Sequence, residues 1–147
     1  MAISDNIKVC RFYLILRELN KALSGFSPHA GLEPFECVST GNWGCGVFGG
    51  DVQLKSLIQW AAACAAGVKL RYVTDSHPAL TDLEPLQTTL SLHAEHGAVG
   101  GLCSVIRSTG LAHLNRAADH SDEDGPSVFE AVMAEIRPDP VSRCTIA

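Results

Sequence analysis

A glycine-rich loop is the part of this chain whose residues are best suited to chemistry. The run TGNWGCGVFGGD, residues 40–51, holds five glycines, one cysteine and two aromatic residues. Glycine reaches positive φ without strain, so successive backbone N–H groups can turn toward one centre and bind an anion. We therefore predict that backbone amides bind a phosphate or diphosphate here, and that the contacts come from Gly44, Cys45, Gly46, Val47 and Phe48.

The non-glycine residues of this loop leave more than one role open. Trp43 and Phe48 either form an apolar wall beside a sugar or base, or anchor the loop to the core. Cys45 precedes a helix N-terminus, which lowers a thiol pKa, but no His or Asp lies near it in sequence, so packing of a small residue is the favoured role. The glycine spacing is GxxGxG, and no lysine follows at the P-loop position. A phosphate site and a purely structural loop are therefore alternatives.

A strand before the loop and a helix after it must hold such a site. The run FECVS, residues 35–39, alternates roughly in polarity and predicts a short strand. Apolar residues repeat at helical spacing over residues 51–66, with Asp51 at the N-cap position and Gly67 as the terminator. The free N–H groups and the dipole at the start of such a helix favour an anion. Residues 68–74 predict a buried strand.

Further helices flank this strand–loop–helix–strand unit. One is predicted over residues 9–24, with Gly25 as its stop. A weaker pattern covers residues 79–94, another helix lies within 98–115, and residues 128–136 form two helical turns. Strands that alternate with helices predict an α/β fold with adjacent parallel strands.

Composition and charge exclude several classes of protein. The 147 residues suffice for one domain, and 46% apolar with 18% charged residues is typical of globular proteins. The net charge of −5 argues against direct DNA binding, and no apolar run reaches the roughly 18 residues of a membrane helix. The N-terminus does not read as a signal peptide, and the six cysteines lack CxxC spacing. We expect an intracellular protein, in the nucleus or cytoplasm, with reduced thiols.

Two other groups of reactive residue types lack the partners that their chemistry needs. His93, His96 and Cys103 resemble metal ligands, but no fourth ligand is evident, so we expect no metal site. Glu33 and Glu36 are close in sequence, yet they are not adjacent and have no glycine context. We expect a solvated loop at these two glutamates.

The glycine loop and its surroundings carry a family resemblance. TGNWGCGVFGGD followed by LKSLIQWAAA resembles the C-terminal half of the macrodomain-like catalytic domain of poly(ADP-ribose) glycohydrolases. The upstream RELNKALSGF, residues 17–26, is similar to that family's helix before the loop, and LRYVT, residues 70–74, to its next strand. The strong resemblance covers about residues 11–75, and a weaker one extends to about residue 107.

This resemblance implies a fold, a partner and a reaction. The fold is α/β, a partial macrodomain-like three-layer architecture with helices packed on a short sheet. Residues 1–110 correspond to the C-terminal portion of the catalytic domain, and residues 111–147 to a poorly defined polar tail. The implied partner is poly(ADP-ribose) or ADP-ribose. The implied reaction is hydrolysis of ribose–ribose O-glycosidic bonds, which needs no cofactor and no metal. In the family the loop binds the diphosphate of ADP-ribose through backbone amides, which places that role on Asn42, Trp43, Gly44, Cys45, Gly46 and Val47, with Phe48 beside the ligand.

The catalytic loop of that family has no counterpart in this sequence. Its two adjacent glutamates protonate the leaving oxygen, but this chain has no Glu-Glu pair and only about forty residues precede the glycine loop. Asp75 also stands where the family has an aromatic residue near the ligand. Three interpretations stay open: a portion of a full hydrolase, a non-catalytic ADP-ribose-binding module, or a decayed remnant. We predict no catalytic residue in this chain.

A halved macrodomain-like sheet also predicts an association surface. Such a sheet leaves one strand edge unpaired and an apolar face uncovered. We therefore expect self-association through the exposed sheet edge.

Overall fold

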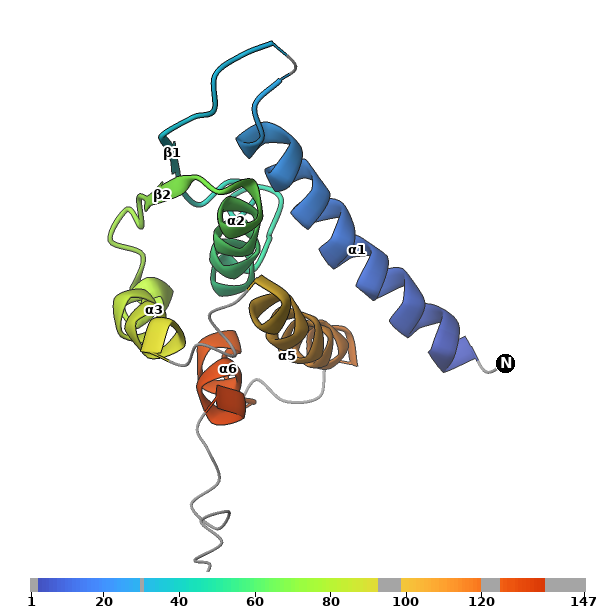
Figure 1. Ribbon diagram of the computed structural model, residues 1–147. Helices are drawn as coiled ribbons and strands as arrows, with labels where there is room; N and C mark the ends of the chain where they lie inside the picture. The colour runs from blue at the N-terminus through green and yellow to red at the C-terminus, as the bar shows by residue number, and fades with distance from the viewer. Residues whose placement is uncertain (1–2, 30, 93–98, 120–124, 137–147) are drawn as a thin grey trace, which may run out of the picture.

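Two short strands joined by a central helix organise the fold. The computed structural model describes residues 3–29, 31–92, 99–119 and 125–136. In Figure 1 the central helix α2 lies between α1 and the two strands, with α5 and α6 beside its other end and α3 on the side away from α1. The elements in chain order are α1 (Ile3–Phe26), β1 (Cys37–Thr40), α2 (Val52–Ala66), β2 (Lys69–Tyr72), the 3-10 helix η1 (Pro78–Leu80), α3 (Leu83–Leu92), α5 (Val99–Asp119) and α6 (Val128–Ile136).

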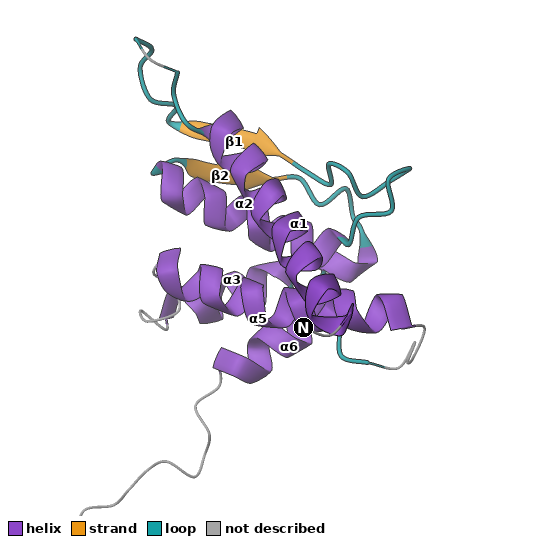
Figure 2. Ribbon diagram, turned by 90° about the vertical axis from the view of Figure 1, so that its right-hand side faces the viewer, coloured by secondary structure: helices purple, strands orange, loops and turns teal. Residues whose placement is uncertain are grey.

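The sheet consists of β1 and β2 in parallel, with α2 as the crossover between them (Figure 2). Cys37 pairs with Lys69 and Thr40 with Tyr72, which confirms the predicted adjacent parallel strands. The expectation that β2 is a buried strand is wrong, because its residues alternate between exposed and half-buried. Helices cover one face of this sheet, so only every second side chain of β2 is shielded.

The helix after the glycine loop has the predicted caps. The carboxylate of Asp51 accepts a hydrogen bond of 2.7 Å from the N–H of Leu54. Gly67 ends α2 with φ of 69°, the left-handed conformation that glycine adopts without strain. Both caps are local features, so sequence alone suffices to predict them.

Two other helices differ from their predicted ends. α1 runs through Gly25 to Phe26, whose side chain is buried against Ala62 and Ala63 of α2, so tertiary packing carries the helix past the predicted stop. α3 begins at Leu83, which places Pro85 in the first turn, where a missing N–H costs no intrahelical hydrogen bond. The last two residues of the predicted helix over 79–94 lie outside the described residues.

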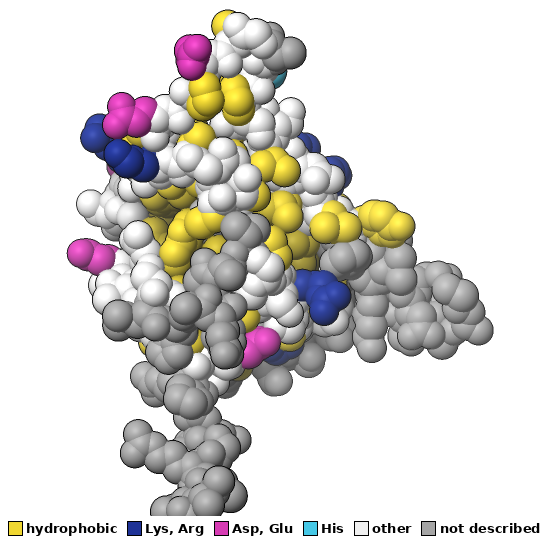
Figure 3. Space-filling model, in the orientation of Figure 1, with side chains coloured by type: hydrophobic (Ala, Val, Ile, Leu, Met, Phe, Trp, Pro, Cys, Tyr) yellow, Lys and Arg dark blue, Asp and Glu magenta, His cyan; other side chains and the backbone are white. Residues whose placement is uncertain are grey.

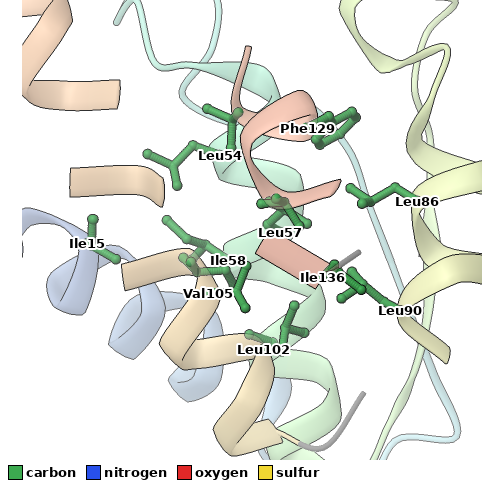
Figure 4. Packing of buried hydrophobic residues seen from close by; sticks show 14 of the residues in the cluster. Ile15, Leu54, Leu57, Ile58, Leu86, Leu90, Leu102, Val105, Phe129 and Ile136 are labelled. Carbon is green, nitrogen blue, oxygen red and sulfur yellow. The ribbon is translucent and has the colours of Figure 1, made fainter. Parts of the chain in front are cut away.

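The hydrophobic core lies where α2, α3, α5 and α6 meet (Figure 4). Leu57 and Ile58 of α2 pack with Leu102 of α5 and Leu90 of α3, and each of these side chains is buried. Gly110 lets α5 approach closely, because a Cβ there would lie 2.9 Å from Leu54 Cδ1. This explains a glycine inside a long helix.

α6 belongs to this core. Its residues Val128, Phe129, Val132 and Ile136 are all buried. The side chain of Gln53 in α2 accepts a hydrogen bond of 3.1 Å from the N–H of Phe129, and it donates one of 2.8 Å to the carbonyl of Ala79. From sequence we expected a poorly defined polar tail over residues 111–147 that contains two helical turns over 128–136. The structure has a helix over those nine residues, and its apolar side chains are buried in the core. The boundary between the two parts of the chain stays a prediction.

The sheet is narrow, and part of the apolar surface is open. Within the described residues β1 and β2 are the only strands, so each keeps an unpaired edge. Figure 3 shows hydrophobic side chains gathered across the centre of one face, with charged side chains toward its periphery. Self-association through the sheet edge stays a prediction, which sedimentation of the purified chain at several concentrations would check. No helix among the described residues is long and apolar enough to cross a membrane.

Candidate functional site

The glycine loop is closed by its own backbone. The N–H of Cys45 donates to the carbonyl of Asn42 at 3.2 Å, and the N–H of Gly49 donates to that of Gly46 at 2.9 Å. A third bond of 3.0 Å, from the N–H of Gly50 to the carbonyl of Gly44, joins the two ends of the turn. The loop is therefore held in shape by its own backbone hydrogen bonds.

Three of the glycines are required by this shape. Gly44 has φ of 76° and Gly49 has φ of 61°, and both sit beside residues of negative φ. Alternation of positive and negative φ is the backbone pattern of anion-binding concavities. At Gly50 a Cβ would lie 2.6 Å from the carbonyl oxygen of Gly44, so no other residue fits without moving the backbone.

Several N–H groups of the loop remain available to a ligand. Among the described residues, the N–H groups of Gly44, Gly46, Val47 and Phe48 donate to no hydrogen-bond acceptor. A Cβ on Gly46 would meet no atom within 4 Å, so that position faces open space. Four of the five residues that we assigned to phosphate contact thus offer a backbone donor, whereas the N–H of Cys45 is used inside the loop.

Hydrogen bonds from polar side chains hold the start of the glycine loop against β2 and α2. Asn42 donates from Nδ2 to the carbonyl of Thr74 at 3.0 Å and accepts from the hydroxyl of Tyr72 at 2.9 Å. Burial and the nearby Cys45 raise the pKa of Tyr72 to about 12, so this hydroxyl remains a donor. Buried Gln59 accepts from the Thr40 hydroxyl at 2.5 Å and donates to the carbonyl of Gly41 at 3.1 Å. The side chain of Asn42 is therefore engaged in holding the loop.

The two aromatic residues of the loop have different surroundings. Trp43 packs against the buried cluster that contains Ala62 and Ala63, so it anchors the loop. Phe48 is 89% exposed and neighbouring Val47 is fully exposed, which leaves their side chains free to contact a ligand. Of the two roles considered, core anchoring falls to Trp43, and Phe48 has no part in the core.

Cys45 does not have the surroundings of a reactive thiol. Burial and the nearby Asp51 raise its pKa, and the charge of Lys55 opposes that shift without overcoming it. Its Sγ lies 3.7 Å from the carbonyl oxygen of Trp43. A thiolate at neutral pH is disfavoured, which supports the packing role expected from sequence.

The carboxylate of Asp51 lies at the start of α2, where it accepts a hydrogen bond from the helix backbone. Burial acts to raise the pKa of Asp51, but hydrogen bonds from His113 and from the N–H of Leu54 outweigh it and hold the pKa below its ordinary value. His113 Nε2 of α5 lies 3.2 Å from Asp51 Oδ2. We expected the first N–H groups of this helix to attract a ligand anion. Because the carboxylate of Asp51 accepts the N–H of Leu54 and brings a negative charge to this helix start, the site is less favourable to a second anion than we expected.

Lys55 brings a positive charge to the loop that sequence analysis did not find. Its Nζ forms an ion pair with Glu18 of α1 and lies 4.3 Å from the centroid of the Trp43 ring. Side chains in a helix lean toward its N-terminus, so a lysine in the first turn reaches back over the preceding loop. Sequence analysis looked for a lysine only at the P-loop position, where none occurs. The position of Lys55, four residues after the N-cap Asp51, was the signal that could have identified it.

A groove of about 570 Å³ joins these groups. It lies between α1, the glycine loop and the start of α2, and it is lined by Glu18, Lys21, Gly44, Phe48 and Lys55 among others. Glu18 also binds Lys21 at 2.9 Å and Arg17 at 3.2 Å. Of the four residues with free N–H groups, Gly44 and Phe48 line the groove and Gly46 and Val47 do not. The groove adds to them the exposed ring of Phe48 and three cations around the carboxylate of Glu18.

The ion pairs of Glu18 should make stability depend on pH. Burial acts to raise its pKa, but hydrogen bonds from Lys55 and Lys21 outweigh it and hold the pKa at about 2, against an ordinary 4.5. A group whose pKa is lowered by folding contributes stability above its unfolded pKa, and this contribution is lost as pH falls toward the folded pKa. Between about pH 5 and pH 2.5, we expect the free energy of unfolding to drop by roughly 1–3 kcal/mol more than in Glu18→Gln.

Urea unfolding of both chains at several pH values measures this difference. The same pH dependence in the two chains would contradict the assignment to Glu18.

The other candidate residues whose placement is described do not come together in one cluster. Among residues whose placement is described, no three His, Cys, Asp or Glu side chains gather as a metal site requires, and His93 and His96 lie outside those residues. Burial raises the pKa of Cys103. Glu36 is exposed and pairs with Lys69 of β2 at 3.4 Å, and Glu33 is exposed. Asp75 has φ of 53° and lies on the surface just beyond β2.

Comparison with known proteins decides the family. The family model described as poly(ADP-ribose) glycohydrolase, macro domain fold, matches residues 7–82, which is slightly more than half of the chain and runs from α1 through the glycine loop to η1. The chain belongs to the poly(ADP-ribose) glycohydrolase family. The α/β unit α1–β1–α2–β2 is accordingly part of a macrodomain fold.

Individual members of the poly(ADP-ribose) glycohydrolase family support this assignment. Poly(ADP-ribose) glycohydrolase 1 of Arabidopsis thaliana is 43% identical over 70 residues, which is 47% of this chain and 12% of that protein. Probable poly(ADP-ribose) glycohydrolase 2 of the same plant is 45% identical over 80 residues, or 54% of this chain and 15% of that protein. Poly(ADP-ribose) glycohydrolase 1 of Caenorhabditis elegans is 34% identical over 99 residues, or 67% and 12%. The chain thus spans about an eighth of the length of these relatives.

Proposed function

We propose that this chain binds ADP-ribose units of poly(ADP-ribose) through the glycine loop, as the diphosphate-binding portion of a poly(ADP-ribose) glycohydrolase. The observation that carries the proposal is the loop backbone, which is prefolded and presents the N–H groups of Gly44, Gly46, Val47 and Phe48 without acceptors among the described residues. Backbone donors held in place need no reorganisation when an anion arrives.

The proposed contacts retain four of the seven residues assigned from sequence and give the other three a supporting role. Gly44, Gly46, Val47 and Phe48 donate backbone N–H groups to the diphosphate, and the ring of Phe48 lies beside the sugar. Asn42, Trp43 and Cys45 hold the loop in shape through their side chains and backbone. The assignment rests on free donors and side-chain exposure, and ligand titration is its test.

The reaction proposed for the whole protein is hydrolysis of ribose–ribose O-glycosidic bonds, which releases ADP-ribose. Such a reaction needs a carboxylic acid placed at the leaving oxygen. No Glu-Glu pair occurs in the sequence, and the described glutamates near the loop are engaged, as Glu18 is with its three cations. We therefore propose that these 147 residues bind the product and do not cut the polymer. The nucleus or cytoplasm, where this polymer would be encountered, is the proposed location.

Calorimetric titration of the purified chain with ADP-ribose tests this function. We expect saturable binding, and we expect no ADP-ribose to be released when the chain is incubated with poly(ADP-ribose). Absence of binding at millimolar ADP-ribose would instead favour a decayed remnant. Release of ADP-ribose by the pure chain would show that a catalytic acid is present after all.

A non-catalytic ADP-ribose-binding module is the second candidate function. Two observations favour a binding module: the glycine loop is fully folded, and the sequence contains no Glu-Glu pair. The mass of the endogenous protein, read with an antibody against residues 111–125, separates the two: a portion of a glycohydrolase belongs to a protein far heavier than 15.6 kDa, whereas a separate binding module has about that mass.

A further inference from the structure

The side chain of Lys55 lies beside Gly44 and Gly50 of the glycine loop. Its Cε lies 3.3 Å from the position that a Cβ on Gly50 would take, and its Nζ lies 3.4 Å from the corresponding position on Gly44. These are the two residues whose hydrogen bond closes the loop. The ammonium group is thus placed at the loop itself, and only 14% of the side chain is exposed.

The ammonium of Lys55 has donor capacity that its present partners do not use. An ammonium carries three N–H donors. Among the described residues, Glu18 is its hydrogen-bond acceptor, and the face of Trp43 is its second contact. A third donor is left for an acceptor in the groove.

Glu18 does not depend on Lys55 alone. Its carboxylate also accepts from Lys21 at 2.9 Å and from Arg17 at 3.2 Å. If Lys55 turns toward another anion, Glu18 keeps two cationic partners and is not left as an unpaired buried charge. Three cations around one carboxylate also leave an excess of positive charge beside the loop, in a chain whose net charge is −5.

We infer that Lys55 is the side-chain charge partner of the bound diphosphate, and that Glu18 is the carboxylate that competes with the diphosphate for Lys55. This inference rests on the proposed function, because it concerns the same loop and the same ligand. The loop amides fix the position of the diphosphate, and the ammonium neutralises part of its charge. Glu18 competes with the ligand for Lys55.

A purely structural role of the ion pair predicts a different outcome. If Glu18 and Lys55 only join α1 to α2, removal of the carboxylate leaves ADP-ribose affinity unchanged or weakens it. If Glu18 competes with the diphosphate, the same change strengthens binding. The sign of the effect of Glu18→Gln on affinity therefore separates the two roles.

The experiment is calorimetric titration of the full chain with ADP-ribose at low ionic strength. We expect Glu18→Gln to bind about threefold more tightly, and Lys55→Met to bind about 10- to 100-fold more weakly, which is the worth of one charge-assisted hydrogen bond. Lys55→Arg keeps the charge and should stay within about threefold of wild type. Lys69→Met is the matched control. Lys69 of β2 pairs with exposed Glu36, away from the loop amides, so its substitution should leave ADP-ribose affinity unchanged.

A double variant removes the effect of folding from this comparison. Glu18→Gln with Lys55→Met replaces both charges, so that no buried charge is left unpaired. We expect this chain to unfold cooperatively and still to lose the same 10- to 100-fold in affinity. Wild-type affinity in the double variant, or unchanged or weaker binding in Glu18→Gln, would overturn the inference and leave the proposed function intact. Absence of binding in the wild-type chain would overturn both.

Discussion

Gly50→Ala should abolish ADP-ribose binding and lower the stability of the chain. The new Cβ would lie 2.6 Å from the carbonyl oxygen of Gly44 and 3.3 Å from Lys55 Cε, so the loop has to open. Opening breaks the hydrogen bond between Gly50 and Gly44 and displaces the free N–H groups from their positions. Forcing a group into a filled space costs about 1–3 kcal/mol. Urea unfolding and ADP-ribose titration of the same preparation measure both effects.

Gly46→Val is the matched variant for Gly50→Ala. A Cβ at Gly46 meets no atom within 4 Å, and its φ is not positive, so the folded chain should accept valine with stability within about 0.5 kcal/mol of wild type. A branched side chain there would still obstruct a diphosphate at the loop amides, so we expect binding to be lost. Retained affinity in Gly46→Val would mean that the ligand does not approach this part of the loop.

Phe129→Ala should have the largest effect on folding among the substitutions considered. The ring is 2% exposed and packs in the main core, with Leu57 of α2 and Leu86 of α3 (Figure 4). Truncation of a buried phenylalanine to alanine costs about 3–5 kcal/mol. A domain of this size is stable by only about 5–15 kcal/mol, so a large part of its stability depends on α6. The midpoint of urea unfolding measures the change.

Phe48→Ala controls for the loss of an aromatic ring. Phe48 is 89% exposed, so its truncation should shift the free energy of unfolding by less than about 0.5 kcal/mol. If Phe129→Ala is equally mild, α6 does not belong to the core, and the polar tail predicted from sequence would be the better description.

The fold was predictable wherever a local signal fixed a local structure. Asp51 and Gly67 bound α2 as expected, since a cap needs only its own helix. The predicted stop of the first helix at Gly25 was wrong. α1 continues to Phe26, because the side chain of Phe26 is buried against α2, and such tertiary packing is not visible in the local sequence. The helix over residues 128–136 was predicted, but its place in the core was not, because that depends on packing against α2, α3 and α5.

In the candidate site, too, features that depend on neighbouring residues could be predicted, whereas contacts between elements distant in sequence could not. The composition of the loop was sufficient to predict backbone donors, and four of the five assigned positions have them free among the described residues. It was not sufficient to show that His113 of α5 pairs with the capping carboxylate of Asp51, because that contact depends on how α5 packs on α2. Nor could it show Glu18 beside Lys55, which requires α1 to lie along α2.

Gln53 has a consequence for the order in which the chain folds. One side chain holds η1 and α6 to α2, through bonds that span 26 and 76 residues of sequence. Bringing together residues 76 apart costs more chain entropy than closing the unit of β1, α2 and β2, which is contiguous. The amide at the start of α6 thus finds its acceptor only after α2 exists. The β1–α2–β2 unit, which carries the glycine loop, should therefore fold first, and α6 should pack onto α2 last. During synthesis the glycine loop would then reach its folded conformation before the hydrophobic core is complete.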